Sequence, residues 1–191
     1  MDMFRQFINN PKEIGSIAPS SSSLINKMTE DIKNYHSIVE LGAGNGCITK
    51  KIIDKGCSSL HTYETNPFYI NRINKINDIN LKLNAFNLQE DVKKESVDIV
   101  ISSLPFLNFN QKEREDLLEQ ISFVLKENGL LIMYSYSSKQ SFTDVQLYFN
   151  NLRMVGYNKA WLNLPPAHIF KYKKHSHSKI ENNLSLMANN D

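Results

Sequence analysis

The run SIVELGAGNG, residues 37–46, decides the fold of this chain. Residues that favour a β-strand lead into three glycines at alternate positions, Gly42, Gly44 and Gly46. Residues 47–53 then carry apolar side chains at helical spacing. The run therefore predicts a strand, a tight turn and a helix whose free N–H groups point at the turn. Glycines there accept positive φ and let a ligand lie against the backbone, although a turn can also hold glycines for steric reasons alone.

An acidic residue ends the next predicted strand. Residues 60–64, LHTYE, form that strand, and Asn66-Pro67 after it starts a helix. In a doubly wound α/β fold, a carboxylate at the place of Glu64 accepts hydrogen bonds from ribose hydroxyls. The glycine turn and Glu64 together favour a nucleotide-like ligand over the alternative, a solvated strand end.

Size and composition describe one ordinary domain. The chain has 191 residues, of which 41% are hydrophobic and 22% charged. Its two cysteines, Cys47 and Cys57, lack the spacing of metal ligands, so we expect reduced thiols of an intracellular protein and no metal. No apolar run approaches the length of about 18 residues that a membrane span needs, and the N-terminal residues do not have the pattern of a signal-peptide core.

The charge is distributed unevenly. Residues 145–180 include six basic side chains and no acidic one. This stretch suits an anionic surface, either a phosphate backbone or lipid headgroups, or it is a solvated edge that lacks acids.

The N-terminal residues suggest two ligand-facing segments. Residues 1–10 place Phe4, Phe7 and Ile8 on one helical face, which either packs on the domain or lies in a lipid interface. The serine run before residue 24 predicts a cap for a helix that ends near residue 33. The hydroxyls of Ser20 and Ser21 could reach a ligand in the glycine turn.

The remaining elements alternate as in an α/β fold. We expect helices over residues 68–76, 111–125 and 141–151, a polar connection over 89–96, and disorder from 176 onward. Strands are expected over 80–85, 97–102, 130–136, 154–160 and 168–173, with the last two as an antiparallel pair. Ligands in such sheets lie beyond the carboxyl ends of the strands, so the corner SSLPF, residues 102–106, is a candidate active-site corner.

Several short motifs together carry a family resemblance. They are the acidic glycine motif at residues 40–46, NP at 10–11, PSS at 19–21, ETNP at 64–67, SLP at 103–105 and WLNLPPA at 161–167. This combination resembles the bacterial phospholipid N-methyltransferases, which convert phosphatidylethanolamine toward phosphatidylcholine. They are class I S-adenosylmethionine (SAM) methyltransferases, and the resemblance covers about residues 4–174.

The resemblance implies an organisation and a cellular setting. The fold would be a doubly wound, Rossmann-like α/β sheet of seven strands in the order 3-2-1-4-5-7-6, with the last strand antiparallel. Residues 1–10 would form a membrane-interface helix, residues 11–174 the methyltransferase domain and residues 175–191 a disordered tail. The enzyme would use SAM, release S-adenosylhomocysteine and need no metal. It would act in the cytoplasm at the inner face of an anionic membrane, without nucleic acid or an obligate protein partner.

The resemblance also assigns site residues. The cofactor would lie against Ser20, Ser21, Glu40, Gly42, Ala43, Gly44, Gly46, Glu64, Thr65, Asn84, Ala85, Ser103 and Leu104. Asn84 stands where an acid is more usual, but its amide oxygen can still accept a hydrogen bond from adenine. Membrane and lipid contacts would come from Phe4, Phe7, Ile8, Lys171, Lys173 and Lys174.

Methyl transfer to an amine is an in-line displacement, so positioning and a deprotonated nucleophile carry most of the catalysis. An aromatic wall would stabilise the cationic methylated product. The catalytic candidates are Tyr136, Phe106 and Trp161, each of which could instead pack in the core, with Ser103 at the corner after the fourth strand. His168 is interpreted as structural.

Three other functions stay open. An rRNA adenine N6-methyltransferase has a similar fold, but such enzymes carry Asn or Asp where Ser103 stands and add a helical domain that holds RNA. A small-molecule methyltransferase and a non-catalytic SAM-binding protein at the membrane surface are the others, because a fold alone does not fix the substrate.

Overall fold

The computed structural model describes residues 21–163 and 165–176. The expectations for the N-terminal helix over residues 1–10, with Phe4, Phe7 and Ile8, lie outside the described residues. So do those for Ser20 and for residues 177–191.

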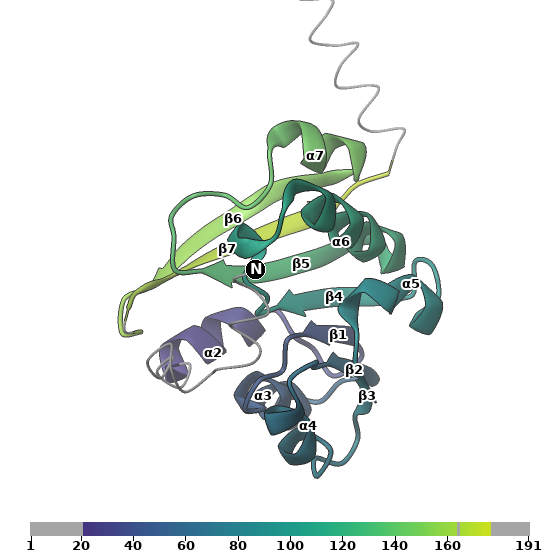
Figure 1. The fold of residues 1–191 in the computed structure, drawn as a ribbon, viewed down its shortest axis with the longest axis vertical. Helices are drawn as coiled ribbons and strands as arrows, with labels where there is room; N and C mark the ends of the chain where they lie inside the picture. The colour runs from purple at the N-terminus through teal and green to yellow at the C-terminus, as the bar shows by residue number, and fades with distance from the viewer. Residues whose placement is uncertain (1–20, 164, 177–191) are drawn as a thin grey trace, which may run out of the picture.

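The described residues form a seven-stranded sheet in the order β3-β2-β1-β4-β5-β7-β6, as predicted (Figure 1). β7 pairs antiparallel with both β5 and β6, and the other neighbouring strands are parallel. The carboxyl ends of β1, β2, β3, β4 and β5 therefore meet at one edge of the sheet, here called the carboxyl edge. The strand bounds are β1 Ser37–Leu41, β2 Ser59–Tyr63, β3 Asn80–Lys82, β4 Val97–Ser102, β5 Leu125–Ser135, β6 Leu152–Ala160 and β7 Ala167–Lys174.

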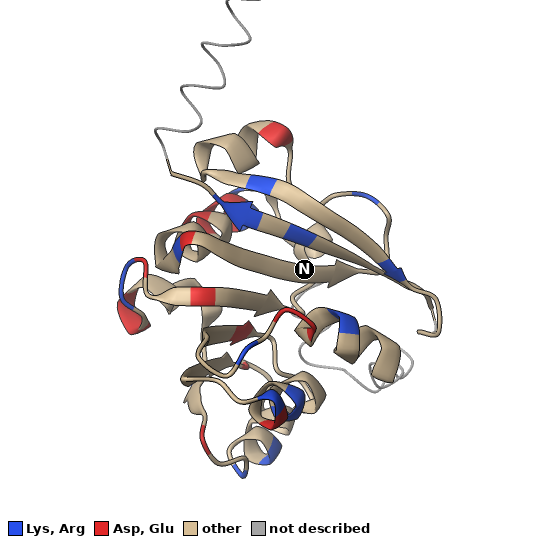
Figure 2. Cartoon of the chain, turned by 180° about the vertical axis from the view of Figure 1, so that it is seen from behind, with Lys and Arg blue, Asp and Glu red and all other residues tan. Residues whose placement is uncertain are grey.

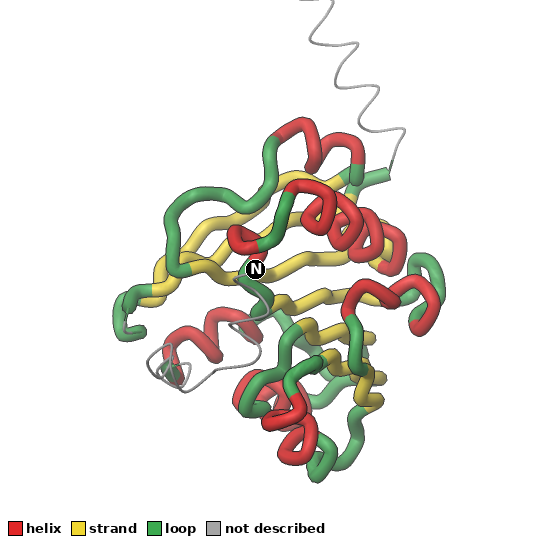
Figure 3. The backbone as a smooth tube through the Cα atoms, in the orientation of Figure 1, coloured by secondary structure: helices red, strands yellow, loops and turns green. Residues whose placement is uncertain are grey.

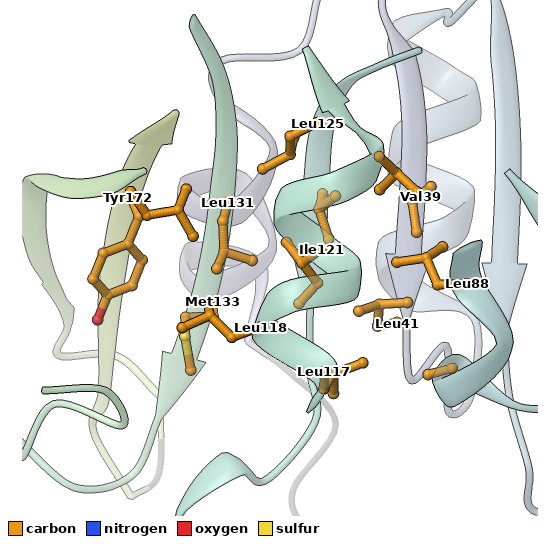
Figure 4. Close-up of a cluster of buried hydrophobic side chains, with 14 of the residues drawn as sticks. Val39, Leu41, Leu88, Leu117, Leu118, Ile121, Leu125, Leu131, Met133 and Tyr172 are labelled. Atoms are coloured by element: carbon orange, nitrogen blue, oxygen red, sulfur yellow. The ribbon is translucent and has the colours of Figure 1, made fainter. Parts of the chain in front are cut away.

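Helices cover both faces of the sheet (Figure 3). On one face, α6 packs its side chains Leu117, Leu118 and Ile121 against the strands, together with α5 and α7 (Figure 4). On the other face, α2 and α3 pack against a second cluster of buried residues. The helix bounds are α2 Ser22–Thr29, α3 Cys47–Lys55, α4 Pro67–Ile73, α5 Leu88–Asp91, α6 Gln111–Val124 and α7 Asp144–Phe149, with 3-10 turns η1 Ala85–Asn87 and η2 Phe106–Asn108.

Several predicted boundaries are wrong. β5 begins at Leu125 rather than at residue 130, because α6 passes directly into the strand through an irregularity that lies between the pairs Val97–Leu125 and Ile99–Leu130. The connection predicted over residues 89–96 begins inside α5. The helix predicted over residues 141–151 is shorter, since a capping box between Thr143 and Gln146 starts it late.

Two of the lysines predicted to bind lipid phosphates are engaged elsewhere. Lys171 Nζ lies 2.6 Å from Glu30 Oε1 and also donates to Asp31 Oδ2. Burial would lower the pKa of Lys171, but its bonds to the two carboxylates raise it. Lys174 is buried, and its Nζ donates to the carbonyl oxygens of Ser122 and Leu125 at 2.7 and 2.8 Å. The expectation that these two ammonium groups are free for phosphates is therefore wrong.

The third lysine, Lys173, is half-buried and lies near the end of β7, where it pairs with Leu130. Because β7 is antiparallel, this end lies at the edge of the sheet opposite the carboxyl edge. Figure 2 shows lysine and arginine residues along both β6 and β7. The basic residues of this stretch therefore lie at different places on the sheet.

We predict that Lys174→Ala lowers the free energy of unfolding by about 1–3 kcal/mol, because it leaves two buried carbonyl groups without their donor. The matched variant Lys173→Ala should change it by less than about 0.5 kcal/mol. Urea unfolding of both variants checks this. Equal effects would contradict a structural role for Lys174.

Candidate active site

The glycine turn follows β1 at the carboxyl edge. The backbone N–H groups of Gly42 and Ala43 both donate to the Tyr63 carbonyl at the end of β2, at 2.9 and 3.0 Å. Gly46 starts α3 with φ of 80°, and a Cβ there would lie 2.8 Å from Ile73 Cδ1. At Gly44 a Cβ would meet no heavy atom within 4 Å. The turn is therefore closely packed at Gly46 and open at Gly44, where a ligand can approach the backbone.

The Glu64 carboxylate is held against this turn. One oxygen, Oε2, accepts from the Gly44 N–H at 2.7 Å, and the other accepts from the Asn66 N–H at 2.7 Å. The side chain is buried. Each carboxylate oxygen has a second lone pair, so both can still accept a hydrogen bond from a ligand hydroxyl.

A second carboxylate, Glu40 of β1, is completely buried. Its Oε2 accepts from Thr49 Oγ1 at 2.7 Å and from Thr62 Oγ1 at 3.4 Å, but Oε1 has no hydrogen-bond partner among the described residues. Burial raises the pKa of this carboxyl from 4.5 to about 7, against the lowering effect of the bonds from Thr49 and Thr62. A buried acceptor without a donor is costly, so the site fits a ligand that brings a hydrogen-bond donor.

These features fit SAM. The open backbone at Gly44 accommodates a ligand that lies on the turn, Glu64 presents acceptors for two hydroxyls, and Glu40 lacks a donor. SAM carries ribose hydroxyls and an amino group, which supply donors of both kinds.

The corner after β4 contacts the glycine turn. The Ser103 N–H donates to the Leu41 carbonyl at 2.8 Å, and Leu104 Cδ2 lies 3.1 Å from the position of a Cβ at Gly42. Ser103 and Leu104 thus contact the glycine turn, and their contact with the cofactor stays a prediction. Phe106 does not face the site: it is 1% exposed and packs against Phe142, with ring centroids 5.0 Å apart. The expectation that Phe106 forms an aromatic wall is wrong, because its ring belongs to the core.

The predicted adenine side follows β3. Asn84 Oδ1 accepts from the Phe86 N–H at 3.0 Å and so caps η1, while its Nδ2 donates to Asn87. Asn84 is exposed, and its oxygen keeps a second lone pair. Ala85 is buried, and Thr65 is exposed directly after Glu64.

The two other aromatic candidates differ in position. Tyr136 follows the carboxyl end of β5, is 38% exposed and packs edge-to-face on Tyr134. Trp161 lies in the turn between β6, the edge strand, and β7; it is 71% exposed, and Lys159 Nζ lies 3.7 Å from its ring centroid. Only Tyr136 lies next to the parallel strands that carry the glycine turn and the β4 corner. β7 lies between β5 and β6, the strands that Tyr136 and Trp161 follow, and a wall shared by these two side chains stays a prediction.

Ser21 caps the N-terminus of α2. Its hydroxyl accepts from the Leu24 N–H at 3.2 Å as the cap of α2, and its own N–H donates to Asn163 Oδ1 at 2.9 Å. Among the described residues, no hydrogen bond joins Ser21 to the glycine turn. The sequence reasoning did not predict this contact of Asn163, although a polar residue within the apolar run WLNL indicates a buried hydrogen bond.

A second missed pair is Tyr157 and His168. The Tyr157 hydroxyl and His168 Nδ1 lie 2.5 Å apart, and burial lowers the pKa of His168. The interpretation of His168 as structural stays a prediction.

No helix within the described ranges is long and apolar enough to cross a membrane. Nor do these ranges hold a group of three or more His, Cys, Asp or Glu side chains that could bind a metal ion.

We predict that Glu40 makes stability depend on pH. Because its pKa is raised on folding, the folded state keeps a proton that the unfolded state releases, so the free energy of unfolding falls as the pH rises from about 4.5 to 7. Glu40→Gln cannot ionise. Between pH 5 and 8 the parent should lose about 2–3 kcal/mol more than the variant by urea unfolding. Parallel profiles would contradict the buried neutral carboxyl.

The comparisons with known proteins agree with this architecture. The N1-methyltransferase of 1,6-didemethyltoxoflavin from Burkholderia thailandensis, solved with S-adenosylhomocysteine, superposes with a TM-score of 0.69 at 11% identity and covers 91% of this chain and 86% of that one. The N-methyltransferase NodS of Bradyrhizobium japonicum superposes with a TM-score of 0.63 at 12% identity, with coverage of 91% and 97%. These likenesses show the fold.

Two sequence matches add the family. An ornithine lipid N-methyltransferase of Singulisphaera acidiphila is 29% identical over 137 residues, which cover 65% of this chain and 71% of that protein. The family described as "Methyltransferase small domain" matches residues 14–162. Since that match spans most of the chain, the chain belongs to the methyltransferase small domain family.

Proposed function

We propose that this SAM-dependent methyltransferase transfers methyl groups to the primary amine of a lipid headgroup at a membrane surface. The observation that carries the enzymatic part is the pair of buried carboxylates, Glu40 and Glu64, beside an open glycine turn. The lipid part is supported by the motif resemblance to phospholipid N-methyltransferases and by the relative named for an ornithine lipid.

In this proposal the cofactor lies along the carboxyl edge from β3 to β4. Glu64 accepts from the ribose hydroxyls, the backbone of Gly42, Ala43, Gly44 and Gly46 cradles the ligand, and Glu40 accepts from its amino group. Thr65, Asn84 and Ala85 border the adenine, and Ser103 with Leu104 closes the β4 side. When bound, SAM supplies an electrophilic methyl group on a sulfonium.

The amine would enter beside β5. A lipid ammonium has a pKa near that of Lys, about 10, so it must lose its proton before it can attack. Tyr136 presents a partly exposed aromatic ring at this place, which would stabilise the methylated cation by about 0.5–2 kcal/mol. Its hydroxyl and that of Ser103 can order the amine by hydrogen bonds.

Two observations favour two different lipid substrates. The motif resemblance favours phosphatidylethanolamine and its methylated intermediates on the route to phosphatidylcholine. The relative from Singulisphaera favours an ornithine lipid, whose headgroup offers an amine without a phosphate. The engagement of Lys171 and Lys174 in internal contacts removes two of the cations expected for a phosphate, which weakens the first choice relative to the second. The shared chemistry is a primary amine on a lipid.

The test is transfer of labelled methyl from SAM to lipids dispersed in detergent, with phosphatidylethanolamine, ornithine lipid and RNA as separate substrates. We expect label in methylated phosphatidylethanolamine, in methylated ornithine lipid or in both. Label in ornithine lipid alone would support a lipid amine as the substrate and would exclude phosphatidylethanolamine. Label in RNA alone, or in none of the three, would contradict the proposal.

A further inference from the structure

The turn between β6 and β7 carries two large apolar side chains in water. Trp161 is 71% exposed and Leu162 is 84% exposed, so Leu162 is the most exposed large hydrophobic residue of the described chain. Scattered single apolar residues are normal on a surface, but two adjacent ones at the end of a hairpin form a continuous apolar tip. We call Trp161 and Leu162 the hairpin tip.

The backbone beside the tip is held firmly. Asn163 is 2% exposed, and its side chain accepts from the Ser21 N–H at 2.9 Å and donates to the Pro165 carbonyl at 2.8 Å. Ala160 pairs with Ala167 where the two strands meet the turn. These contacts hold the residues that flank the hairpin tip, while its two apolar side chains stay exposed.

The charge around the tip suits an anionic surface. Lys159 lies over the Trp161 ring, with its Nζ 3.7 Å from the centroid. Tryptophan and lysine are the side chains that anchor proteins at the boundary between headgroups and acyl chains. Residues 145–180 include no acid, and Glu30 and Asp31 of the neighbouring segment pair with Lys171.

The tip also lies on the side where substrate would enter. The turn between β6 and β7 lies at the carboxyl edge, the side to which the arrowheads of β4 and β5 point (Figure 1). His168, just after the turn, pairs with Ser135, the residue before Tyr136. The bond from Ser21 to Asn163 joins the chain segment that follows residues 1–20 to the same turn.

We propose that the hairpin tip inserts into the interface of an anionic bilayer and holds the carboxyl edge against the membrane. The occupant is the bilayer itself, bound by the two apolar side chains and by Lys159. This inference rests on the proposed function, because a lipid amine must reach Tyr136 from the membrane.

The chain offers a direct probe, because Trp161 is its single tryptophan. Vesicles of equal parts phosphatidylglycerol and phosphatidylethanolamine should shift the emission of the full chain to shorter wavelength, and brominated acyl chains should quench it. Emission that stays unchanged while the protein sediments with vesicles would show that another segment binds, and would overturn the proposal. Emission already at short wavelength and unaffected by vesicles would show that the chain covers its own tip, which would also overturn it.

A matched pair of variants tests the energetic role. Trp161→Ser with Leu162→Ser should weaken sedimentation with these vesicles by at least about tenfold. Val145→Ser with Phe149→Ser removes two side chains of similar exposure, 63% and 74%, from α7, and should change it by less than about twofold. Equal losses in both double variants would overturn the role of the tip.

Measurements of methyl transfer distinguish the failure of this inference from the failure of the proposed function. Leu162→Ser alone, which leaves the catalytic candidate Trp161 in place, should keep parental methyl transfer to lipid dispersed in detergent and lower transfer to lipid in vesicles. Parental transfer in vesicles would overturn the inference and leave lipid methylation intact. If the parent methylates no lipid even in detergent, the proposed function fails, and vesicle sedimentation of the two double variants still decides whether the tip binds a bilayer.

Discussion

The site depends on one hydrogen bond, from the Gly44 N–H to Glu64 Oε2 at 2.7 Å. It joins the turn after β1 to the residue after β2, and the Tyr63 carbonyl reinforces it by accepting from the two preceding N–H groups of the turn. Parallel pairing of β1 with β2 sets these groups opposite each other. The carboxylate is therefore ordered before any ligand arrives, which lowers the entropy lost on binding.

Glu40 is a second buried carboxylate of the same site. Its buried Oε1 lacks a donor among the described residues, and the raised pKa shows what burial of that carboxyl costs when it ionises. In the proposed function, a ligand that donates a hydrogen bond to Glu40 would recover part of this cost.

Much of this architecture could be predicted from the sequence. Buried strands and glycine spacing are local patterns, and the family resemblance implied the strand order, which the structure confirms. The errors concern contacts between distant residues. Lys171 of β7 pairs with Glu30 at the end of α2, and Phe106 packs in the core beside Phe142; no local pattern reveals either contact. Trp161 is exposed because it lies in the turn that follows β6.

The central claim is that a ligand lies against the open turn at Gly44. Gly44→Ala tests it most directly, because the added methyl group meets no protein atom within 4 Å and costs only the strain of a positive φ, about 1 kcal/mol. Titration calorimetry with S-adenosylhomocysteine should show an affinity at least about tenfold weaker than that of the parent. A folded variant with the affinity of the parent would contradict the account.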